Sequence, residues 1–297
     1  MGAATTTGPA TDAGLPEYLA TLGLPGIFDV HVHFMHPRVL AKVWAYFDAA
    51  GPKLGRPWPV RYRTSDEDRV ATLRAMGVAH YSALSYAHKP GVATFMNAWC
   101  TEFAALHPES LHSATFYPEP EADSYVAEAL EQGVEVFKAH VQVGEFSPDD
   151  PLLDPVWARL ERHAVPIVLH AGSGPAPGRY TGVEPVRRVL ARFPDLRLVI
   201  AHLGTPETRG FVELARAHAH VRLDTTMAFV DFWDDDPSFE VVDHLVDLQA
   251  KVLFGSDFPN IPYPYAHQVE ALARLGLGDD WMRDVLWHNG ARLFGRA

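Results

Sequence analysis

Short apolar stretches alternate with segments of helical periodicity along this chain from Ile27 onward. Such alternation is typical of βα units around a parallel sheet and argues against a β-sandwich. Eight strands are predicted, at residues 27–33, 80–86, 111–117, 135–141, 166–171, 198–203, 221–226 and 252–257. No linker rich in Pro, Gly or Ser follows residue 26. We therefore expect one domain over residues 26–297 with an α/β fold, a (β/α)8 TIM barrel.

One predicted connection is unusually long. Residues 34–64 follow the first strand and show no regular helix before the helical pattern that begins at Asp66. A segment that leaves a barrel strand starts on the catalytic face, where long connections are usually functional. We expect a lid-like insertion that contacts substrate; the alternative is a surface insertion packed by its own aromatic side chains. The candidate substrate-binding residues in it are Trp44, Phe47, Trp58, Arg61 and Arg63.

The composition is that of a globular protein with a large core, since 47% of the 297 residues are hydrophobic and 21% are charged. The net charge of −12 disfavours nucleic acid or an anionic membrane as the main partner. Cys100 is the single cysteine, which favours a reducing, cytoplasmic location without disulfides. Residues 1–14 do not resemble a signal peptide, and no apolar run is long enough to span a bilayer. A disordered or loosely packed leader is expected over residues 1–25.

Two His-x-His pairs differ in their predicted surroundings. His31 and His33 end the first predicted strand, where side chains two residues apart point to the same side, as two ligands of one metal ion must. His218 and His220 end an alanine-rich helical segment, where histidine suits the helix dipole. Because 16 of 297 residues are histidine, chance alone yields about one such pair. Position in the predicted fold, rather than spacing, makes His31 and His33 the metal candidates.

Three further residues of ligand type stand at the ends of predicted strands. His170, His202 and Asp257 each close an apolar strand, on the face where barrel active sites are built. A carboxylate after an apolar strand is costly unless something compensates its charge, and a metal ion does so. Each residue alone is as compatible with a buried structural role as with metal binding. Their joint occurrence with His31 and His33 favours a metal-dependent site.

The order His-x-His, His, His, Asp on strands 1, 5, 6 and 8 resembles that of the amidohydrolase superfamily of metal-dependent barrels. The local sequence is similar to its amidohydrolase-2 branch, related to aminocarboxymuconate semialdehyde decarboxylase, from residue 26 to the end. The stretches that carry the resemblance are Phe28-Asp29-Val30-His31-Val32-His33, Phe146-Ser147-Pro148-Asp149-Asp150-Pro151, Val168-Leu169-His170-Ala171-Gly172, Ala201-His202-Leu203-Gly204, Phe254-Gly255-Ser256-Asp257-Phe258-Pro259 and Asn289-Gly290-Ala291-Arg292-Leu293-Phe294-Gly295.

The resemblance implies that His31, His33, His170 and Asp257 bind one divalent metal ion, with His202 as the nearby acid/base. It also implies a catalytic role for Asp257, which would share the proton. Zinc is favoured because it accepts imidazole and carboxylate ligands and keeps a position for water in catalytic sites. Mn2+, Fe2+ and Co2+ are the alternatives. Zinc in such a site lowers the pKa of bound water toward about 7.

Lys138 raises a separate question, because binuclear members of the superfamily use a carboxylated lysine on strand 4 to bridge two metals. Here His140 follows two residues later, and this Lys-x-His arrangement resembles the mononuclear branch. Lys138 and His140 are therefore candidates for a substrate-binding or supporting polar role. A bridging lysine and an ion pair inside the barrel remain the alternatives for Lys138.

These features predict an enzyme that acts on a small molecule. The first hypothesis is hydrolysis of a C–N or C–O bond in an amide, cyclic amide or lactone. The second is metal-dependent, non-oxidative decarboxylation of a small unsaturated or aromatic acid, for which Arg61, Arg63 and Arg179 are candidate carboxylate anchors. A barrel without chemistry is disfavoured by the ligand-type residues, and a metal-dependent nuclease by the acidic charge. The sequence leaves the substrate and a homodimeric state open.

Overall fold

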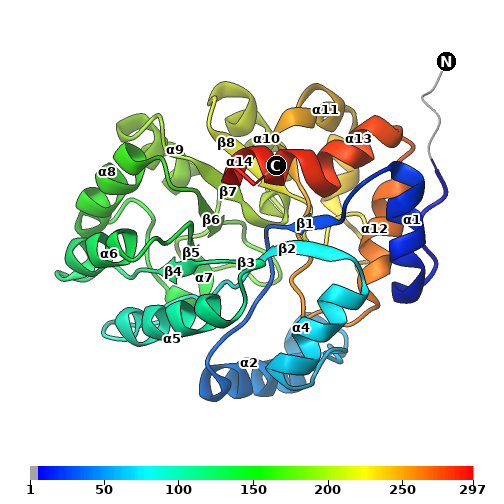
Figure 1. The fold of residues 1–297 in the computed structure, drawn as a ribbon. Helices are drawn as coiled ribbons and strands as arrows, with labels where there is room; N and C mark the ends of the chain where they lie inside the picture. The colour runs from blue at the N-terminus through cyan, green and yellow to red at the C-terminus, as the bar shows by residue number, and fades with distance from the viewer. Residues whose placement is uncertain (1–5, 297) are drawn as a thin grey trace. The chain divides into compact units, whose positions relative to one another are not determined.

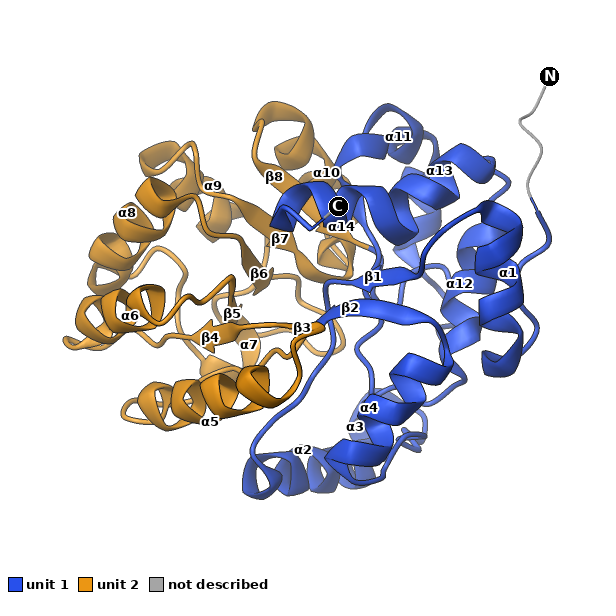
Figure 2. Cartoon of the chain, in the orientation of Figure 1, with its two compact units in different colours: residues 1–81, 225–297 blue, residues 82–224 orange. Residues whose placement is uncertain are grey.

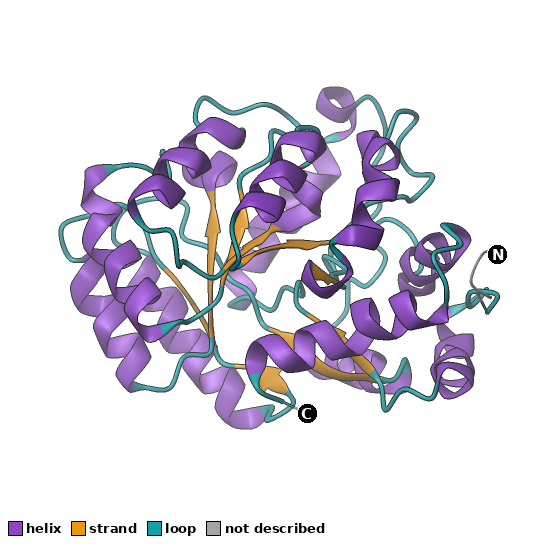
Figure 3. Cartoon of the chain, turned by 90° about the horizontal axis from the view of Figure 1, so that it is seen from above, coloured by secondary structure: helices purple, strands orange, loops and turns teal. Residues whose placement is uncertain are grey.

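Strands alternate with helices along residues 6–296, which are the residues described by the computed structural model (Figure 1). They form two compact units (Figure 2). Unit 1 comprises the described residues up to Tyr81 and from Thr225 onward, and unit 2 comprises residues 82–224. Loops join the helices and strands throughout (Figure 3).

Unit 2 is built around parallel strands that follow one another in chain order. These strands are β4 (Ser113–Thr115), β5 (Val136–His140), β6 (Ile167–His170), β7 (Leu198–Ile200) and β8 (Val221–Asp224). The register places His140 opposite His170 and Leu169 opposite Ile200. Every residue of β6 and β7 is buried, as a parallel sheet requires when both of its faces are covered. Parallel pairing brings the carboxyl ends of these strands to one edge, where His140 and His170 lie.

The helices and short elements of unit 2 connect these strands. They are α5 (Ala93–Leu106), β3 (Ser110–Leu111), α6 (Ala122–Glu131), α7 (Val141–Gly144), η2 (Pro151–Leu153), α8 (Asp154–His163), α9 (Val183–Arg192), η3 (Ala201–Gly204) and α10 (Thr208–Ala217). Helix α5 buries Cys100, whose Sγ lies 3.9 Å from the carbonyl oxygen of Ala83. Burial raises the pKa of this thiol to about 12.

Unit 1 contains a parallel pair of strands, β1 (Ile27–Asp29) and β2 (Val78–Ser82), with Asp29 opposite Tyr81. Its helices before β2 are η1 (Asp12–Gly14), α1 (Leu15–Leu22), α2 (Pro37–Ala49), α3 (Gly51–Leu54) and α4 (Asp66–Ala75). Its later elements are η4 (Pro237–Val241), α11 (Val242–Asp247), η5 (Gln249–Lys251), β9 (Val252–Leu253), α12 (Tyr265–Arg274), α13 (Asp279–Arg283), the π-helical turn η6 (Asp284–His288) and α14 (Asn289–Phe294). None of the helices within residues 6–296 combines the length and hydrophobicity of a membrane span.

All eight predicted strands contain strand residues, but the observed strands are shorter than the apolar stretches. The first prediction covered residues 27–33, whereas β1 ends at Asp29. Val30 and Val32 are nevertheless fully buried. The third predicted strand is divided into β3 and β4 by His112. Hydrophobicity thus marks which segments are buried, whereas strand length depends on where backbone pairing stops.

Residues 34–64 differ from the expectation of a connection without regular structure, because they contain α2 and α3. Pro37 occupies the first turn of α2, where its missing N–H costs nothing, and the His36 side chain accepts a hydrogen bond from the Arg38 N–H. The apolar side chains recur at helical spacing, with Leu40 buried. Proline was therefore a helix start here rather than a sign of irregular structure.

The leader also differs from the expectation of disorder or loose packing, over the part that the structure describes. Residues 1–5 lie outside the described residues. Helix α1 buries Leu15, Leu19 and Leu22, and the Asp12 carboxylate accepts hydrogen bonds from the Tyr62 hydroxyl and the Ala266 N–H. These contacts attach the segment to the rest of unit 1, because a buried apolar face and a bonded carboxylate both favour order.

Candidate metal centre

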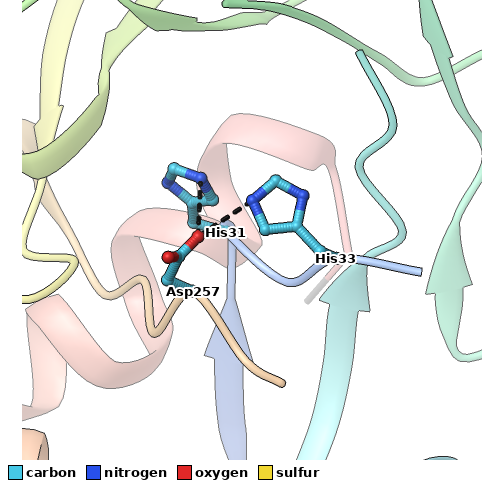
Figure 4. Close-up of side chains that lie close together, drawn as sticks. All are labelled: His31, His33 and Asp257. Carbon is cyan, nitrogen blue, oxygen red and sulfur yellow. Dashed lines mark ion pairs between the residues drawn. The ribbon is translucent and has the colours of Figure 1, made fainter. Parts of the chain in front are cut away.

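Three of the predicted ligands come together in unit 1. Figure 4 shows the imidazole rings of His31 and His33 beside the carboxylate of Asp257. Asp257 Oδ1 lies 2.9 Å from His33 Nε2 and 3.7 Å from His31 Nε2. The side chains are only 1%, 5% and 13% exposed for His31, His33 and Asp257, in that order. The three residues form a group able to hold a metal ion.

The donor set fits a divalent metal. Two ligands about 2.1 Å from one ion in a tetrahedral arrangement lie roughly 3.4 Å apart. The separations of 2.9 and 3.7 Å bracket that value, and one ligand atom from each residue lies within 4.8 Å of the others. Imidazole nitrogen and carboxylate oxygen suit zinc and also manganese, iron or cobalt. The group is therefore compatible with one catalytic metal ion.

Backbone bonds hold the two ligand-bearing segments together. The His33 N–H donates to the Phe258 carbonyl oxygen at 2.7 Å, and the Asp257 N–H donates to the His31 carbonyl oxygen at 2.8 Å. Asp257 adopts a left-handed conformation with φ 63°, which aspartate tolerates better than most residues with a side chain. Its carbonyl oxygen accepts from the Asn260 N–H at 2.8 Å. The tight turn fixes the direction of the Asp257 side chain.

His170 and His202, the remaining predicted residues of the site, are neighbours within unit 2. Their ring centroids lie 4.8 Å apart, and the ring of His140 stacks on that of His170 at 3.9 Å. His170 Nε2 lies 3.0 Å from the Gly174 carbonyl oxygen. A carbonyl only accepts, so this contact assigns the ring proton to Nε2 and the lone pair to Nδ1. Unit 2 thus carries a cluster of three histidines.

A close approach of two loops places His202 beside His170. A Cβ at Gly172 would lie 2.4 Å from the Thr205 carbonyl oxygen, so only glycine fits where the loop after β6 passes the η3 turn. His202 itself is left-handed, with φ 56° and ψ 35°. Its N–H donates to Asp224 Oδ1 at 2.8 Å, which helps to hold this unfavourable backbone conformation.

Lys138 and His140 occupy different environments. Lys138 is fully buried in β5, and its carbonyl oxygen accepts a hydrogen bond from Thr115 Oγ1 at 2.8 Å. His140 is half-buried at the end of the strand, between the rings of Tyr86 and His170. His140 therefore belongs to the histidine cluster, whereas Lys138 lies inside the core of unit 2.

The aromatic residues of segment 34–64 pack against the loops that follow Thr225 and Asp257 in the chain. The indole N–H groups of Trp44 and Trp58 donate to Asn260, at 3.1 Å to its side-chain oxygen and 2.6 Å to its carbonyl oxygen. Trp58 is 5% exposed and contacts the rings of Phe47, Phe232 and Trp233. Segment 34–64 is thus hydrogen-bonded to Asn260, three residues after the metal-ligand candidate Asp257.

The predicted arginine anchors are exposed. Arg63 pairs with Asp48 at 2.9 Å and also donates to the Trp44 carbonyl oxygen. Arg61 and Arg179 are exposed as well, and Arg179 lies over the ring of Tyr180. Exposed guanidinium groups are well hydrated, so their positions give weak support to carboxylate binding.

The Tyr263 hydroxyl is a feature of unit 1 that sequence reasoning missed. It is buried without a hydrogen-bond partner among residues 6–296. Burial first, and then the charge of Asp257, raise the pKa of Tyr263 well above its usual value. It is therefore a neutral donor close enough to Asp257 to respond to its charge. A tyrosine among several aromatic residues gives no sequence pattern that would have singled it out.

A family model described as Amidohydrolase matches residues 28–296. The chain belongs to the amidohydrolase family. Its fold is therefore the (β/α)8 TIM barrel that the sequence predicted, in agreement with the similar solved structures. Among curated protein sequences, none matches this amidohydrolase.

Three solved structures illustrate the range of similar proteins. An uncharacterized TIM-barrel protein from Bordetella bronchiseptica has a TM-score of 0.75 and 21% identity, covering 91% of this chain and 99% of that chain. A 5-carboxyvanillate decarboxylase from Novosphingobium aromaticivorans, complexed with manganese and 4-hydroxy-3-methoxy-5-nitrobenzoic acid, has a TM-score of 0.63, 13% identity and coverages of 92% and 97%. A dihydroorotase from Campylobacter jejuni has a TM-score of 0.57, 14% identity and coverages of 91% and 83%. Both a decarboxylase and a hydrolase thus share the fold of this amidohydrolase.

Proposed function

We propose that this chain is a metal-dependent hydrolase that cleaves a C–N or C–O bond, in an amide, cyclic amide or lactone of a small molecule. The observation that carries the proposal is the buried group of His31, His33 and Asp257 in a member of the amidohydrolase family. Residue types and spacing fit one divalent ion, with zinc favoured and manganese as the main alternative. When bound, such an ion supplies a Lewis acid that acidifies water and polarises a substrate oxygen.

The proposed fourth ligand is His170, which the family resemblance assigns. Its support within unit 2 is the contact of Nε2 with the Gly174 carbonyl oxygen. A metal-binding histidine commonly donates its other ring N–H to a carbonyl or carboxylate, which orients the ring. In His170 this arrangement presents Nδ1 as the nitrogen with the lone pair.

His202 is proposed to move the proton. Its position is rigid, because the turn that carries it is left-handed and its N–H is bonded to Asp224. A fixed imidazole can accept a proton from water and return it to a leaving nitrogen or oxygen. Asp257 would hold the metal ion and share the proton. Lys138 and His140 would support the site rather than react.

Decarboxylation of a small unsaturated or aromatic acid is the second candidate. It is supported by the likeness in fold to 5-carboxyvanillate decarboxylase and by the aromatic cluster around Trp58. An aromatic wall excludes water and suits a planar substrate. The exposure of Arg61 and Arg63 weakens this candidate, because a substrate carboxylate calls for a fixed cation.

A panel of substrates separates the two reactions. The protein is loaded with Zn2+ or with Mn2+ and incubated with lactones, cyclic amides and aromatic carboxylic acids. The proposal expects hydrolysis of a lactone or amide, followed as formation of the acid product by chromatography, abolished by a chelator and absent in His31→Ala. Release of CO2 from an aromatic acid without any hydrolysis would favour the second candidate. Turnover that is equal in His31→Ala would contradict a metal-dependent reaction of either kind.

A further inference from the structure

Asp29 is a fully buried carboxylate at the end of β1, two residues before His31. Its Oδ1 accepts hydrogen bonds from the N–H groups of His31 at 3.0 Å and of Ser256 at 3.2 Å. Its Oδ2 accepts from the Tyr265 hydroxyl at 2.7 Å. One side chain therefore contacts two segments that are distant in sequence and that each carry metal-ligand candidates.

The chemistry of this contact suits a carboxylate. A buried carboxylate is costly unless hydrogen bonds replace its water, and the donors to Asp29 do so. Burial and the charge of Asp29 raise the pKa of Tyr265 well above its usual value, so its hydroxyl remains a donor. All three groups donate and Asp29 only accepts, which makes the arrangement complementary.

The contact lies beyond the ends of the named strands. Strand β1 stops at Asp29, and β9 stops at Leu253, before Ser256 and Asp257. Beyond these ends the two segments are joined by an isolated parallel bridge between Val32 and Phe258 and by the hydrogen bond from the Asp257 N–H to the His31 carbonyl oxygen. The Asp29 carboxylate also joins the two segments directly beside the residues that carry the ligand side chains, with one oxygen shared between the N–H of His31 and the N–H next to Asp257.

We propose that Asp29 is a positioning residue of the metal centre, whose hydrogen bonds set the distance between the His31–His33 segment and Asp257. It acts through the backbone and binds neither metal nor substrate. This inference rests on the proposed metal-dependent function. It assigns a role to a charged residue inside an apolar strand, where a residue that served only to fill the core would be apolar.

Two substitutions separate hydrogen-bond geometry from charge. Asp29→Asn removes the charge but keeps an oxygen acceptor for both N–H groups, while its amide can donate to the Tyr265 oxygen. Asp29→Glu keeps the charge but lengthens the side chain by one methylene. The measurement is the affinity of the metal-free protein for Zn2+, by competition with a chromophoric chelator, together with the melting temperature without metal.

Asp29→Asn is expected to bind Zn2+ nearly as well as the wild type, whereas Asp29→Glu and Asp29→Ala bind it roughly 10- to 100-fold more weakly. Trp157→Phe is the control for general destabilisation. Trp157 is fully buried in unit 2, and its indole N–H donates to the Pro148 carbonyl oxygen at 2.8 Å. This variant should melt at a lower temperature than the wild type and keep its Zn2+ affinity.

The opposite pattern, with Asn weak and Glu unchanged, would show that charge rather than positioning matters and would overturn the proposal. So would Zn2+ affinities that follow melting temperature equally in the Asp29 variants and in Trp157→Phe. If Asp29→Ala does not fold, the Asn and Glu variants still decide the question. A wild-type protein that binds no Zn2+ or Mn2+ would instead refute the proposed function itself, and the inference with it.

Discussion

The two His-x-His pairs of this chain share a motif and differ in almost everything else. His31 and His33 follow a strand, are nearly fully buried, and face Asp257 at 2.9 Å from His33. His218 is the C-cap of α10, as predicted for a helix end, and His220 precedes β8; both are half-buried. Even a carboxylate is present near the second pair, since His220 Nε2 lies 3.9 Å from Asp195 Oδ1.

Burial and backbone geometry therefore distinguish the pairs more than composition does. The Asp195 side chain is 77% exposed and that of His220 40%, so water competes for both groups and screens their attraction. The first pair has lost most of that water. Burial away from water strengthens the attraction between these side chains and a bound cation. It also makes a buried Asp257 carboxylate without a bound cation or hydrogen-bond donor energetically costly.

The largest expected effect is on metal binding. His31→Ala and Asp257→Ala each remove one ligand atom from a small buried set, so purified protein should lose most of its metal by elemental analysis. His218→Ala and His220→Ala are the matched controls and should keep the wild-type content. Equal loss from the second pair would reverse the comparison, because the exposed histidines would then be the ligands.

Substitution of His202, which lies outside the proposed ligand set, should affect turnover instead of metal binding. His202→Asn keeps a polar side chain that tolerates the left-handed backbone, and it should lower kcat by roughly 10²- to 10⁴-fold while metal content stays constant. Steady-state kinetics and elemental analysis on the same preparation test this. Loss of metal together with retained activity after reconstitution would make His202 a ligand.

The packing of segment 34–64 against Asn260 should have a smaller effect. Trp58→Ala removes a buried ring and the hydrogen bond to the Asn260 carbonyl oxygen. We expect kcat/KM to fall about tenfold, a loss of about 1.4 kcal/mol, with metal content unchanged. Tyr46→Ala is the control from the same segment, because Tyr46 is 47% exposed. An equal fall in both variants would assign the effect to the segment as a whole.

The smallest effect concerns the ion pair between Asp123 and Arg159, whose side chains are partly exposed, like those of His220 and Asp195. Hydrogen bonding to Arg159 is the main cause that lowers the pKa of Asp123 from its usual 3.8. The folded state therefore binds this proton less readily than the unfolded state, so the stabilisation is complete above about pH 4 and is lost as pH falls further. Asp123→Asn should cost about 0.5 kcal/mol at pH 7 and progressively less as pH falls below about 4, measured by urea unfolding. A cost independent of pH would contradict the ionic origin.

The sequence predicted the strands well because their buried faces require apolar, β-branched residues. It predicted the ends poorly, since Val32, which is buried, takes part only in an isolated bridge to Phe258 after β1 has ended at Asp29. The helix α2 was missed because its proline-flanked sequence suggested a loop. Its apolar residues Leu40, Val43, Trp44 and Phe47 nonetheless recur at spacings of three, one and three, the pattern of an amphipathic helix.

The residue types of the candidate site were predictable from the sequence, but the hydrogen bonds and backbone turns that position them were not. His31, His33 and Asp257 stand at strand ends, where their chemistry is conspicuous. Asp29 was visible as a charged residue between Phe28 and Val30, and such a position is itself a sign of a bonded carboxylate. The left-handed turn at His202 depends on the tertiary contact with Asp224, which local sequence does not encode.

Burial of Cys100 gives the chain an internal reporter of unfolding. Alkylating reagents react with the thiolate, and burial both covers the Cys100 thiol and raises its pKa to about 12, which disfavours the thiolate at pH 7. The native protein should therefore resist iodoacetamide. Cys100 is the single cysteine of the sequence, so each modified molecule records one opening of the structure around α5. Mass spectrometry of timed reactions with iodoacetamide would measure how readily the structure around Cys100 opens, without any mutation.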